Sequence, residues 1–335
     1  MKKMYKVFKI VSVTFISIIL LVSLSVFIYH KIQLHKESAI ISNNGTFVKF
    51  HNKKMNVYHE GNGDNTYVFM PGSGIAAPVY EMKGLYSKFS KDNRIAVVER
   101  AGYGYSDVFH DERDIDTILH QTRKALSKSG NKPPYILVPH SLSGLEAVYW
   151  AQKYPDEVKA IIALDIGLPK EYANNPLRFT DVLTIKGMNL LTKMGFYRLA
   201  PSAAYDPEVI RQSFLTEQEK ENFKALSYKQ MFNDNMEQEI LQSPTNGKKS
   251  VKLPMPKETP ILFLSAYTED NKHSKYTKRK NKNYKEFAEQ LLISDVKKIK
   301  GKHSIHLYAP DEIYNLSIDF IREKVEKNND ERSLE

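Results

Sequence analysis

The sequence contains no cysteine among its 335 residues, so it can form no disulfide, no thiolate metal site and no cysteine nucleophile. Internal repeats and extended low-complexity tracts are also missing. The fold must therefore be stabilised by its hydrophobic core, and a chain of this length can bury a large one. We expect one large domain, joined to the amino-terminal segment that is described below.

A concentrated basic patch and a nucleic-acid-binding motif are absent, although the formal net charge is +10 and the pI is near 9.3. The lysines are dispersed along the amino terminus, residues 278–285 and the carboxyl-terminal region. We therefore expect no nucleic-acid partner. Solubility, or attraction to an anionic membrane or cell envelope, explains this charge better. The sequence does not indicate an oligomeric state.

One long hydrophobic run, Val11 to Tyr29, stands out because it carries no charge and follows four lysines at positions 2, 3, 6 and 9. A helix of this length crosses a bilayer, so residues 1–30 are predicted to be an uncleaved, single-pass membrane anchor. A cleaved signal peptide is the alternative, but the run exceeds the usual core of about 7–15 residues and no small-x-small cleavage site follows. The lysines favour a cytoplasmic amino terminus and an extracytoplasmic domain.

Beyond a polar linker at residues 31–45, a domain is predicted over residues 46–335. It opens on a hairpin and continues with short apolar runs that alternate with helical patterns, such as the helix expected over residues 115–126. This alternation predicts an α/β fold with a mostly parallel, doubly wound sheet. The runs lie at residues 67–70, 95–98, 135–138, 160–164, 261–264 and 295–299.

The strand rhythm stops between Pro169 and Pro260, where helices are expected at Thr180 to Met194 and Thr216 to Gln242. A structureless loop of this length would be unusual in a compact domain. The segment is therefore predicted to be a helical cap, at about residues 170–258, that is inserted into the sheet domain. Such insertions often serve as lids over a site.

A strand that runs into a serine and continues as a helix occurs at Tyr135 to Lys153, with Ser141 at the junction. A tight turn of this kind raises the serine oxygen above the sheet, and the Leu142 N–H at the helix start can face a developing oxyanion. A serine that merely caps the helix is the plainer interpretation.

The segment from Pro139 to Ser143 resembles the Gly-x-Ser-x-Gly elbow of the α/β-hydrolase family, with proline and serine in place of its two glycines. Met70-Pro-Gly-Ser-Gly74 resembles the family's His-Gly oxyanion loop, with Pro71 in place of the histidine. Because this loop lacks the spacing of a dinucleotide or phosphate site, we do not expect a nucleotide there. The resemblance implies a nucleophile at Ser141 and oxyanion donors at the Ser73 and Leu142 amides.

Two further segments extend the resemblance, which covers nearly all of Thr46 to Ile321. Residues 97–107 are similar to the family's Asp-Arg-x-Gly-x-Gly-x-Ser, with Glu99 in place of the aspartate. Residues 301–312 resemble its Gly-x-Gly-His loop, with Lys302 in place of the second glycine. The second match implies that His303 is the base, and His306 is the alternative.

The acid partner is less well defined by the resemblance. The family usually supplies it just after the strand that follows the cap, which selects Glu269. A slip of one residue selects Asp270, and relatives that draw the acid from the preceding strand would select Asp165. The order serine, acid, histidine is kept in every version.

The resemblance implies a membrane-anchored serine hydrolase that cleaves a carboxylic ester or related acyl bond of a small-molecule substrate, without a metal or organic cofactor. One alternative is an aminopeptidase of the proline iminopeptidase type, which would need a cap carboxylate to bind the free amino group. The other is a catalytically silent binding protein, because four motif positions are altered. The candidate cap carboxylates, most of them expected on a solvated helix face, are Glu217, Glu219, Glu221, Glu237 and Glu239.

Overall fold

The computed structural model describes residues 1–42, 44–200 and 204–327. Its centre is an eight-stranded sheet with the strand order β1-β2-β4-β3-β5-β6-β7-β8. The β1–β2 and β2–β4 pairs are antiparallel and the remaining pairs are parallel, as the sequence predicts. The strands are β1 (Thr46–Phe50), β2 (Lys53–Glu60), β3 (Thr66–Met70), β4 (Arg94–Glu99), β5 (Tyr135–Pro139), β6 (Val158–Leu164), β7 (Ile261–Tyr267) and β8 (Ser294–Lys300).

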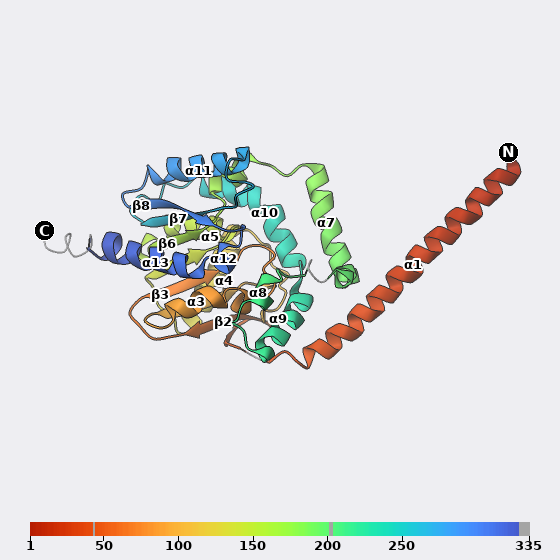
Figure 1. Cartoon of the computed structure of the whole chain (residues 1–335), viewed down its shortest axis with the longest axis horizontal. Helices are drawn as coiled ribbons and strands as arrows, with labels where there is room; N and C mark the ends of the chain where they lie inside the picture. The colour runs from red at the N-terminus through yellow and green to blue at the C-terminus, as the bar shows by residue number, and fades with distance from the viewer. Residues whose placement is uncertain (43, 201–203, 328–335) are drawn as a thin grey trace.

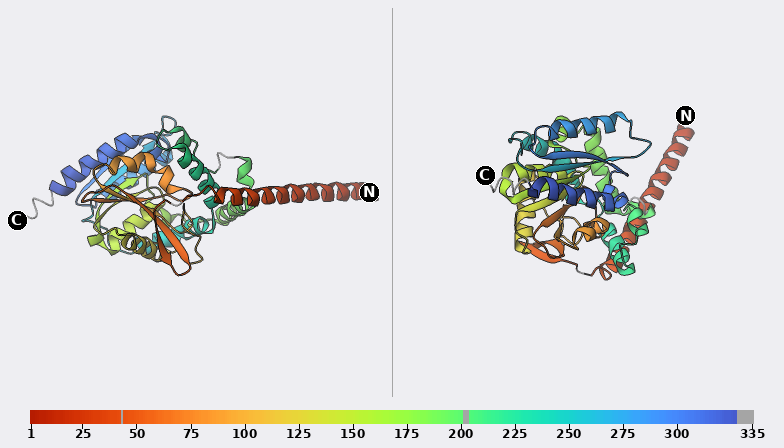
Figure 2. Two further views of the ribbon diagram at one scale, coloured as in Figure 1. Left: turned by 90° about the horizontal axis from the view of Figure 1, so that it is seen from below. Right: turned by 60° about the vertical axis from the view of Figure 1, so that its left-hand side comes forward.

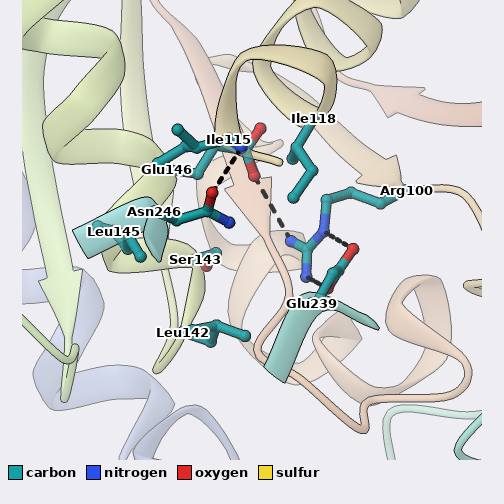
Figure 3. A pocket seen from close by; sticks show the side chains of 9 residues that line it. All are labelled: Arg100, Ile115, Ile118, Leu142, Ser143, Leu145, Glu146, Glu239 and Asn246. Carbon is teal, nitrogen blue, oxygen red and sulfur yellow. Dashed lines mark hydrogen bonds and ion pairs between the residues drawn. The ribbon is translucent and has the colours of Figure 1, made fainter. Parts of the chain in front are cut away.

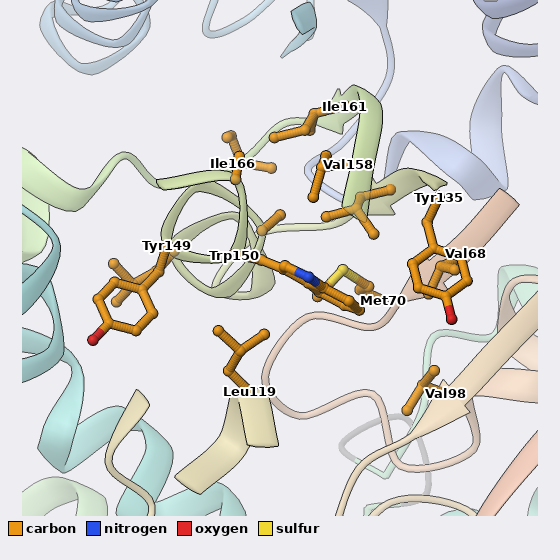
Figure 4. Packing of buried hydrophobic residues seen from close by; sticks show 14 of the residues in the cluster. Val68, Met70, Val98, Leu119, Tyr135, Tyr149, Trp150, Val158, Ile161 and Ile166 are labelled. Carbon is orange, nitrogen blue, oxygen red and sulfur yellow. The ribbon is translucent and has the colours of Figure 1, made fainter. Parts of the chain in front are cut away.

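Helices cover both faces of this sheet (Figure 1). One face packs against α4 (Ile115–Lys128), α5 (Ser143–Lys153) and α11 (Lys275–Ala288). Figure 4 shows part of this cluster, with Trp150 of α5 among side chains of the sheet and Leu119 of α4. The other packs against α3 (Lys83–Phe89), α12 (Ile305–Tyr308) and α13 (Pro310–Phe320), which continues as the π-helical η4 (Ile321–Glu326). Because both faces are covered, the central strands are apolar throughout rather than alternating.

The cap is helical, as predicted, but its second long helix is divided. The single helix expected from Thr216 to Gln242 is wrong, because Phe232 has a φ of +27° and the Asn233 side chain caps a new helix. An asparagine side chain that accepts backbone N–H groups favours a helix start over helix continuation. The cap elements are α6 (Pro169–Asn174), α7 (Phe179–Met194), η2 (Phe196–Leu199), α8 (Glu208–Arg211), α9 (Glu217–Gln230) and α10 (Asp234–Ser250).

The amino-terminal helix α1 (Lys2–Ser38) is longer than the predicted anchor, and the first part of the expected linker is helical. No glycine or proline interrupts this segment. Its apolar stretch is fully exposed, and Figures 1 and 2 show it projecting away from the sheet domain. The helix is long and apolar enough to cross a membrane, a property that signal sequences share. Its carboxyl-terminal turns contact the cap.

Candidate active site

Ser141 lies in the sharp turn between β5 and α5 with a φ of +53°, a left-handed conformation that is strained for a residue with a side chain. Ser143, the smaller residue of the altered elbow, stabilises this turn. Its hydroxyl accepts a hydrogen bond from the His140 amide at 3.0 Å and lies 2.7 Å from the Met70 carbonyl oxygen. Gly144 lets α5 pass close to the next strand, since a Cβ there would lie 2.3 Å from Ile166 Cβ.

The structure brings Ser141, Asp165 and His303 together at the carboxyl ends of the parallel strands β5, β6 and β8. Ser141 Oγ lies 2.8 Å from His303 Nε2, and His303 Nδ1 lies 2.7 Å from Asp165 Oδ2. Asp165 follows β6 and His303 follows β8. Ligands of open α/β sheets usually bind at this edge, outside the carboxyl ends of the strands. The arrangement has the contacts of a nucleophile, a base and an orienting acid.

The carboxylate favoured from the sequence, Glu269, is in a different place. Its side chain is 55% exposed and pairs with Lys272 at 2.6 Å and Lys300 at 3.3 Å, and these lysines lower its pKa. Asp270 is also exposed, in the same surface loop. The position that contacts His303 is Asp165, the third candidate. Asp165 reaches His303 because its φ of +45° turns the chain sharply where β6 ends. The loop that carries His303 lies at the same carboxyl ends of the strands.

Lys280 is a residue of this site that the sequence interpretation missed. Its Nζ donates to Asp165 Oδ1 at 2.5 Å and to the Ala266 carbonyl oxygen at 3.0 Å, and the Ala266 amide donates to the same Oδ1 at 2.7 Å. Both charged side chains are buried. A signal was present, because Lys280 falls on the inward face of α11 in register with Thr277, Tyr284 and Ala288. A lysine at an inward position needs a buried partner.

Two further histidines, His140 and His306, lie close to His303, the predicted base. His306, the alternative base, is buried, and its Nε2 lies 3.4 Å from Glu81 Oε1. The His140 ring lies between His303 and His306, with centroids 4.8 Å from each, and its Nε2 lies 3.1 Å from the His303 carbonyl oxygen. Burial, together with His306 and His303, holds the pKa of His140 well below its usual value. A neutral His140 therefore supports the loop that carries His303.

The two predicted oxyanion donors, the amides of Ser73 and Leu142, lie on either side of Ser141. Ser73 and Ser141 line the same cavity, and a Cβ on the adjacent Gly72 would lie 2.9 Å from Ser141 Cβ. Leu142 is the N-cap residue of α5, where the helix dipole favours negative charge. Within the described ranges, neither amide N–H donates a hydrogen bond to a protein acceptor. Both are therefore available to a ligand at Ser141.

The cavity above Ser141 has a volume of about 450 Å³. Its floor contains the serine and His303, and the cap supplies Tyr205, Asp206 and Met231. Of the described residues that line the cavity, none is one of the five cap glutamates considered for binding an amino group. The cavity has room for a small organic substrate.

Below the elbow, a buried charged cluster joins the cap to the oxyanion loop (Figure 3). Arg100 contacts Glu239 through Nε at 3.2 Å and through Nη2 at 3.0 Å, and its Nη1 donates to the Pro71 carbonyl oxygen at 2.9 Å. Arg113 contacts Glu239 from the other side at 3.0 Å. Although burial opposes ionisation, the two arginines hold the pKa of Glu239 below its ordinary value. Glu239 is therefore an exception to the expectation that most of the five cap glutamates lie on a solvated helix face.

The sequence matches the alpha/beta hydrolase fold family model over residues 57–296, and the chain belongs to this family. The uncharacterized protein YbdG of Bacillus subtilis (strain 168) is 62% identical over 322 residues, which cover 96% of this chain and 99% of that protein.

Two solved structures show the same fold. Epoxide hydrolase A from Mycobacterium thermoresistibile has a TM-score of 0.61 at 16% identity, and the alignment covers 84% of this chain and 99% of that one. A carboxylesterase from Nitrososphaera gargenis has a TM-score of 0.57 at 14% identity, covering 84% and 100%. At these identities the likeness concerns the fold alone.

Proposed function

We propose that this protein is a membrane-anchored serine hydrolase that cleaves a carboxylic ester or a related acyl bond. The observation that carries the proposal is the hydrogen-bonded chain from Ser141 through His303 to Asp165. Membership of the α/β-hydrolase family supports hydrolase chemistry in general. A serine nucleophile favours an acyl-enzyme, whereas a carboxylate nucleophile would favour epoxide or haloalkane substrates.

In the proposed reaction, Ser141 Oγ attacks the carbonyl carbon while His303 Nε2 accepts the hydroxyl proton. Asp165 holds the imidazole in position and stabilises its positive charge. The Ser73 and Leu142 amides stabilise the oxyanion. When the tetrahedral intermediate collapses, the bond to the leaving group breaks and His303 gives its proton to the departing alcohol. Water then attacks the acyl-enzyme by the same steps, which releases the acid and restores Ser141.

The membrane part of the proposal rests on α1. An exposed apolar helix of this length is unstable in water and stable across a bilayer. With the four lysines on the cytoplasmic side, the catalytic domain lies outside the cytoplasm. An uncleaved helix then keeps the enzyme at the membrane surface.

An ester hydrolase is favoured over an aminopeptidase by the surroundings of the cap carboxylates. None of the five cap glutamates is among the described residues that line the cavity; Glu219 pairs with Lys83, and Glu239 pairs with two arginines. Asp206 of the cap does line the cavity, but its two oxygens accept hydrogen bonds from the Glu208 amide and the Tyr308 hydroxyl. A carboxylate that binds a substrate ammonium group needs an oxygen that is available to it.

A fluorophosphonate probe tests the nucleophile on the full chain in detergent. Wild-type protein is expected to be labelled, whereas Ser141→Ala is not and His303→Ala reacts at least about 100-fold more slowly. Ser304→Ala is the matched control because Ser304 lines the same cavity, and it is expected to label normally. Equal labelling of Ser141→Ala and wild type would refute the assignment.

A further inference from the structure

An apolar stripe on the cap helix α7 is exposed although it lies on an ordered helix. Its large side chains are Phe179, Leu183, Leu190 and Leu191, with exposed fractions of 77%, 54%, 61% and 52%. Their spacing of four, eleven and twelve residues from Phe179 places them on one side of the helix. Soluble proteins rarely expose contiguous apolar patches of this kind unless something binds there.

The stripe is separate from the contacts that hold α7 on the protein. Asn189 is buried and donates to Asp234 of α10 at 3.1 Å, and Ile185 packs on the cluster of Tyr103, Phe232 and Met236. At 3.6 residues per turn, these residues lie about 100–160° around the helix from Leu183 and Leu190. Because α7 is already anchored by this inner face, the outer stripe is available for a separate partner.

The helix α1 is fastened to the same end of the cap. Arg198 of η2 pairs with Glu37 through both guanidinium Nη atoms, each at 2.7 Å, and its Nε donates to His30 Nδ1 at 2.8 Å. Both partners of the ion pair are largely buried. Gly195, at the end of α7, lies directly against His30, where a Cβ would come within 2.4 Å of the His30 Cβ. These contacts fix the direction in which the apolar part of α1 leaves the cap.

This attachment determines which side of the protein is closest to a membrane that α1 spans. In Figure 1 the cap helices lie between the sheet and α1, and α7 rises from the region where α1 meets the cap. Tyr205 and Met231 of the cap line the cavity that contains Ser141 and His303, so this cavity lies beneath the cap. The cap and the cavity beneath it are thus turned toward the bilayer, whereas the amino ends of the strands are turned away.

We propose that the outer stripe of α7 lies in the headgroup and upper acyl region of the bilayer that α1 spans, so that the substrate is a lipid ester supplied by that bilayer. This inference rests on the proposed serine hydrolase and its anchor. A helix lies in a membrane interface when its apolar side chains are buried about 5–10 Å below the headgroups and its polar ones remain in water. The exposed Lys186 suits the boundary with anionic headgroups.

Continuity with α1 selects a bilayer rather than a protein as the partner of this stripe. Both exposed apolar surfaces, the run of α1 and the stripe of α7, are at the same end of the molecule and are joined by the Arg198–Glu37 pair. A lipid ester that leaves the bilayer beside α7 would meet the cap segment at Tyr205 and Met231, which line the cavity of Ser141. A short path of this kind spares the substrate's acyl chain from crossing water.

The position of the stripe can be measured without any reaction, because the chain has no cysteine to compete with a single introduced one. Leu183→Cys and Leu190→Cys, each carrying a nitroxide label, are placed in phosphatidylcholine–phosphatidylglycerol vesicles as full-length protein. The labels are expected to collide with oxygen, which concentrates in the bilayer, more than with a water-soluble nickel chelate. Leu292→Cys, equally exposed but at the start of β8, is the control and is expected to show the reverse. Equal exposure of positions 190 and 292 to the nickel chelate would overturn the proposal.

The substrate class is tested by comparing a soluble ester with a lipid ester in vesicles. The triple variant Leu183→Ser, Leu190→Ser and Leu191→Ser is expected to hydrolyse a vesicle-embedded monoacylglycerol about tenfold more slowly than wild type. Its hydrolysis of soluble p-nitrophenyl acetate is expected to change less than about twofold, because these residues do not line the cavity of Ser141. The paired change Val251→Ser and Leu292→Ser controls for lost surface hydrophobicity.

The two proposals fail in different ways. If the protein reacts with neither ester nor fluorophosphonate, the serine hydrolase is refuted, and the nitroxide measurement still decides where α7 lies. If the soluble ester is cleaved but the triple variant acts on the vesicle ester as fast as wild type, the lipid-ester inference is refuted and the hydrolase stands.

Discussion

At the scale of single residues, the unusual feature of the site is the buried ammonium group behind its acid. The carboxylate of Asp165 is shared between His303 on one oxygen and Lys280 on the other. Lys280 fixes the Oδ1 atom of this carboxylate, and with it the position of Oδ2 against His303. Lys280 is therefore a positioning residue, since it acts on His303 only through Asp165.

Replacing Lys280 is expected to lower kcat more than it raises KM for a soluble ester. In Lys280→Met, the Asp165 carboxylate loses the ammonium group that fixes one of its oxygens, so His303 is held less precisely against Ser141. We expect kcat to fall about tenfold while KM changes less than about twofold. Lys280→Arg retains the charge and is expected to recover most of kcat, and steady-state kinetics measure both variants. If kcat and KM change equally in the methionine variant, Lys280 has only a structural role.

Glu99, the replacement for the family's aspartate, is expected to make folding stability depend on pH. Burial raises the pKa of Glu99 to about 7, against hydrogen bonds from the Tyr105 amide and Asn56. The folded state therefore binds this proton more tightly than the unfolded state, and stability falls as pH rises from about 4.5 to 7. The contribution to the free energy of unfolding that is lost over this range is about 3 kcal/mol.

Urea unfolding of the full chain in detergent at several pH values measures this effect. Relative to Glu99→Gln, which has no such proton, wild type is expected to lose stability between pH 5 and pH 8. Glu258→Gln, at an exposed position, is the control and is expected to follow wild type. Identical pH profiles for Glu99→Gln and wild type would show that the buried carboxyl does not titrate in this range.

At the scale of elements, the fold holds the oxyanion loop through the cap. Arg100 follows β4 and links Pro71, which follows β3, to Glu239 on α10. The Glu239 carboxylate is therefore one of the buried groups that couple the cap to the sheet domain. The small cavity beside this cluster, about 20 Å³, is large enough for about one water molecule.

Removing Glu239 is expected to be strongly destabilising. Glu239→Ala leaves Arg100 and Arg113 buried without their shared partner, which costs about 3–5 kcal/mol of unfolding free energy. Glu217→Ala, which breaks an exposed pair on α9, is expected to leave the free energy of unfolding nearly unchanged. Denaturant midpoints of the two variants test the difference. A similar small loss in both would show that the cluster does not join the cap to the sheet domain.

At the scale of the whole molecule, the proposal that α1 is an uncleaved membrane anchor can be tested directly. An uncleaved anchor predicts that the mature chain retains its amino-terminal lysines and resists extraction from membranes by alkaline carbonate. Mass spectrometry of the native amino terminus and extraction of the membrane fraction measure both. Release by high salt would indicate electrostatic attachment alone, and a chain that begins after Tyr29 would indicate a cleaved signal peptide.

The sequence by itself determined the features that depend on neighbouring residues. The alternation of apolar runs with helical patterns was sufficient for the α/β class, the turn at Ser141 for the elbow, and the uninterrupted apolar run for α1. Each follows from local periodicity or from the conformational preferences of a short segment.

Only the tertiary structure decided between the carboxylates. Glu269 and Asp165 fit the chain order equally well, but the arrangement of β6, β7 and β8 places Asp165, and not the exposed loop of Glu269, against His303. The same holds for Lys280 and for the attachment of α1 to Arg198, since their partners lie 115 and 161 residues away in the chain. Contacts at such separations depend on how whole elements pack, which local sequence patterns do not encode.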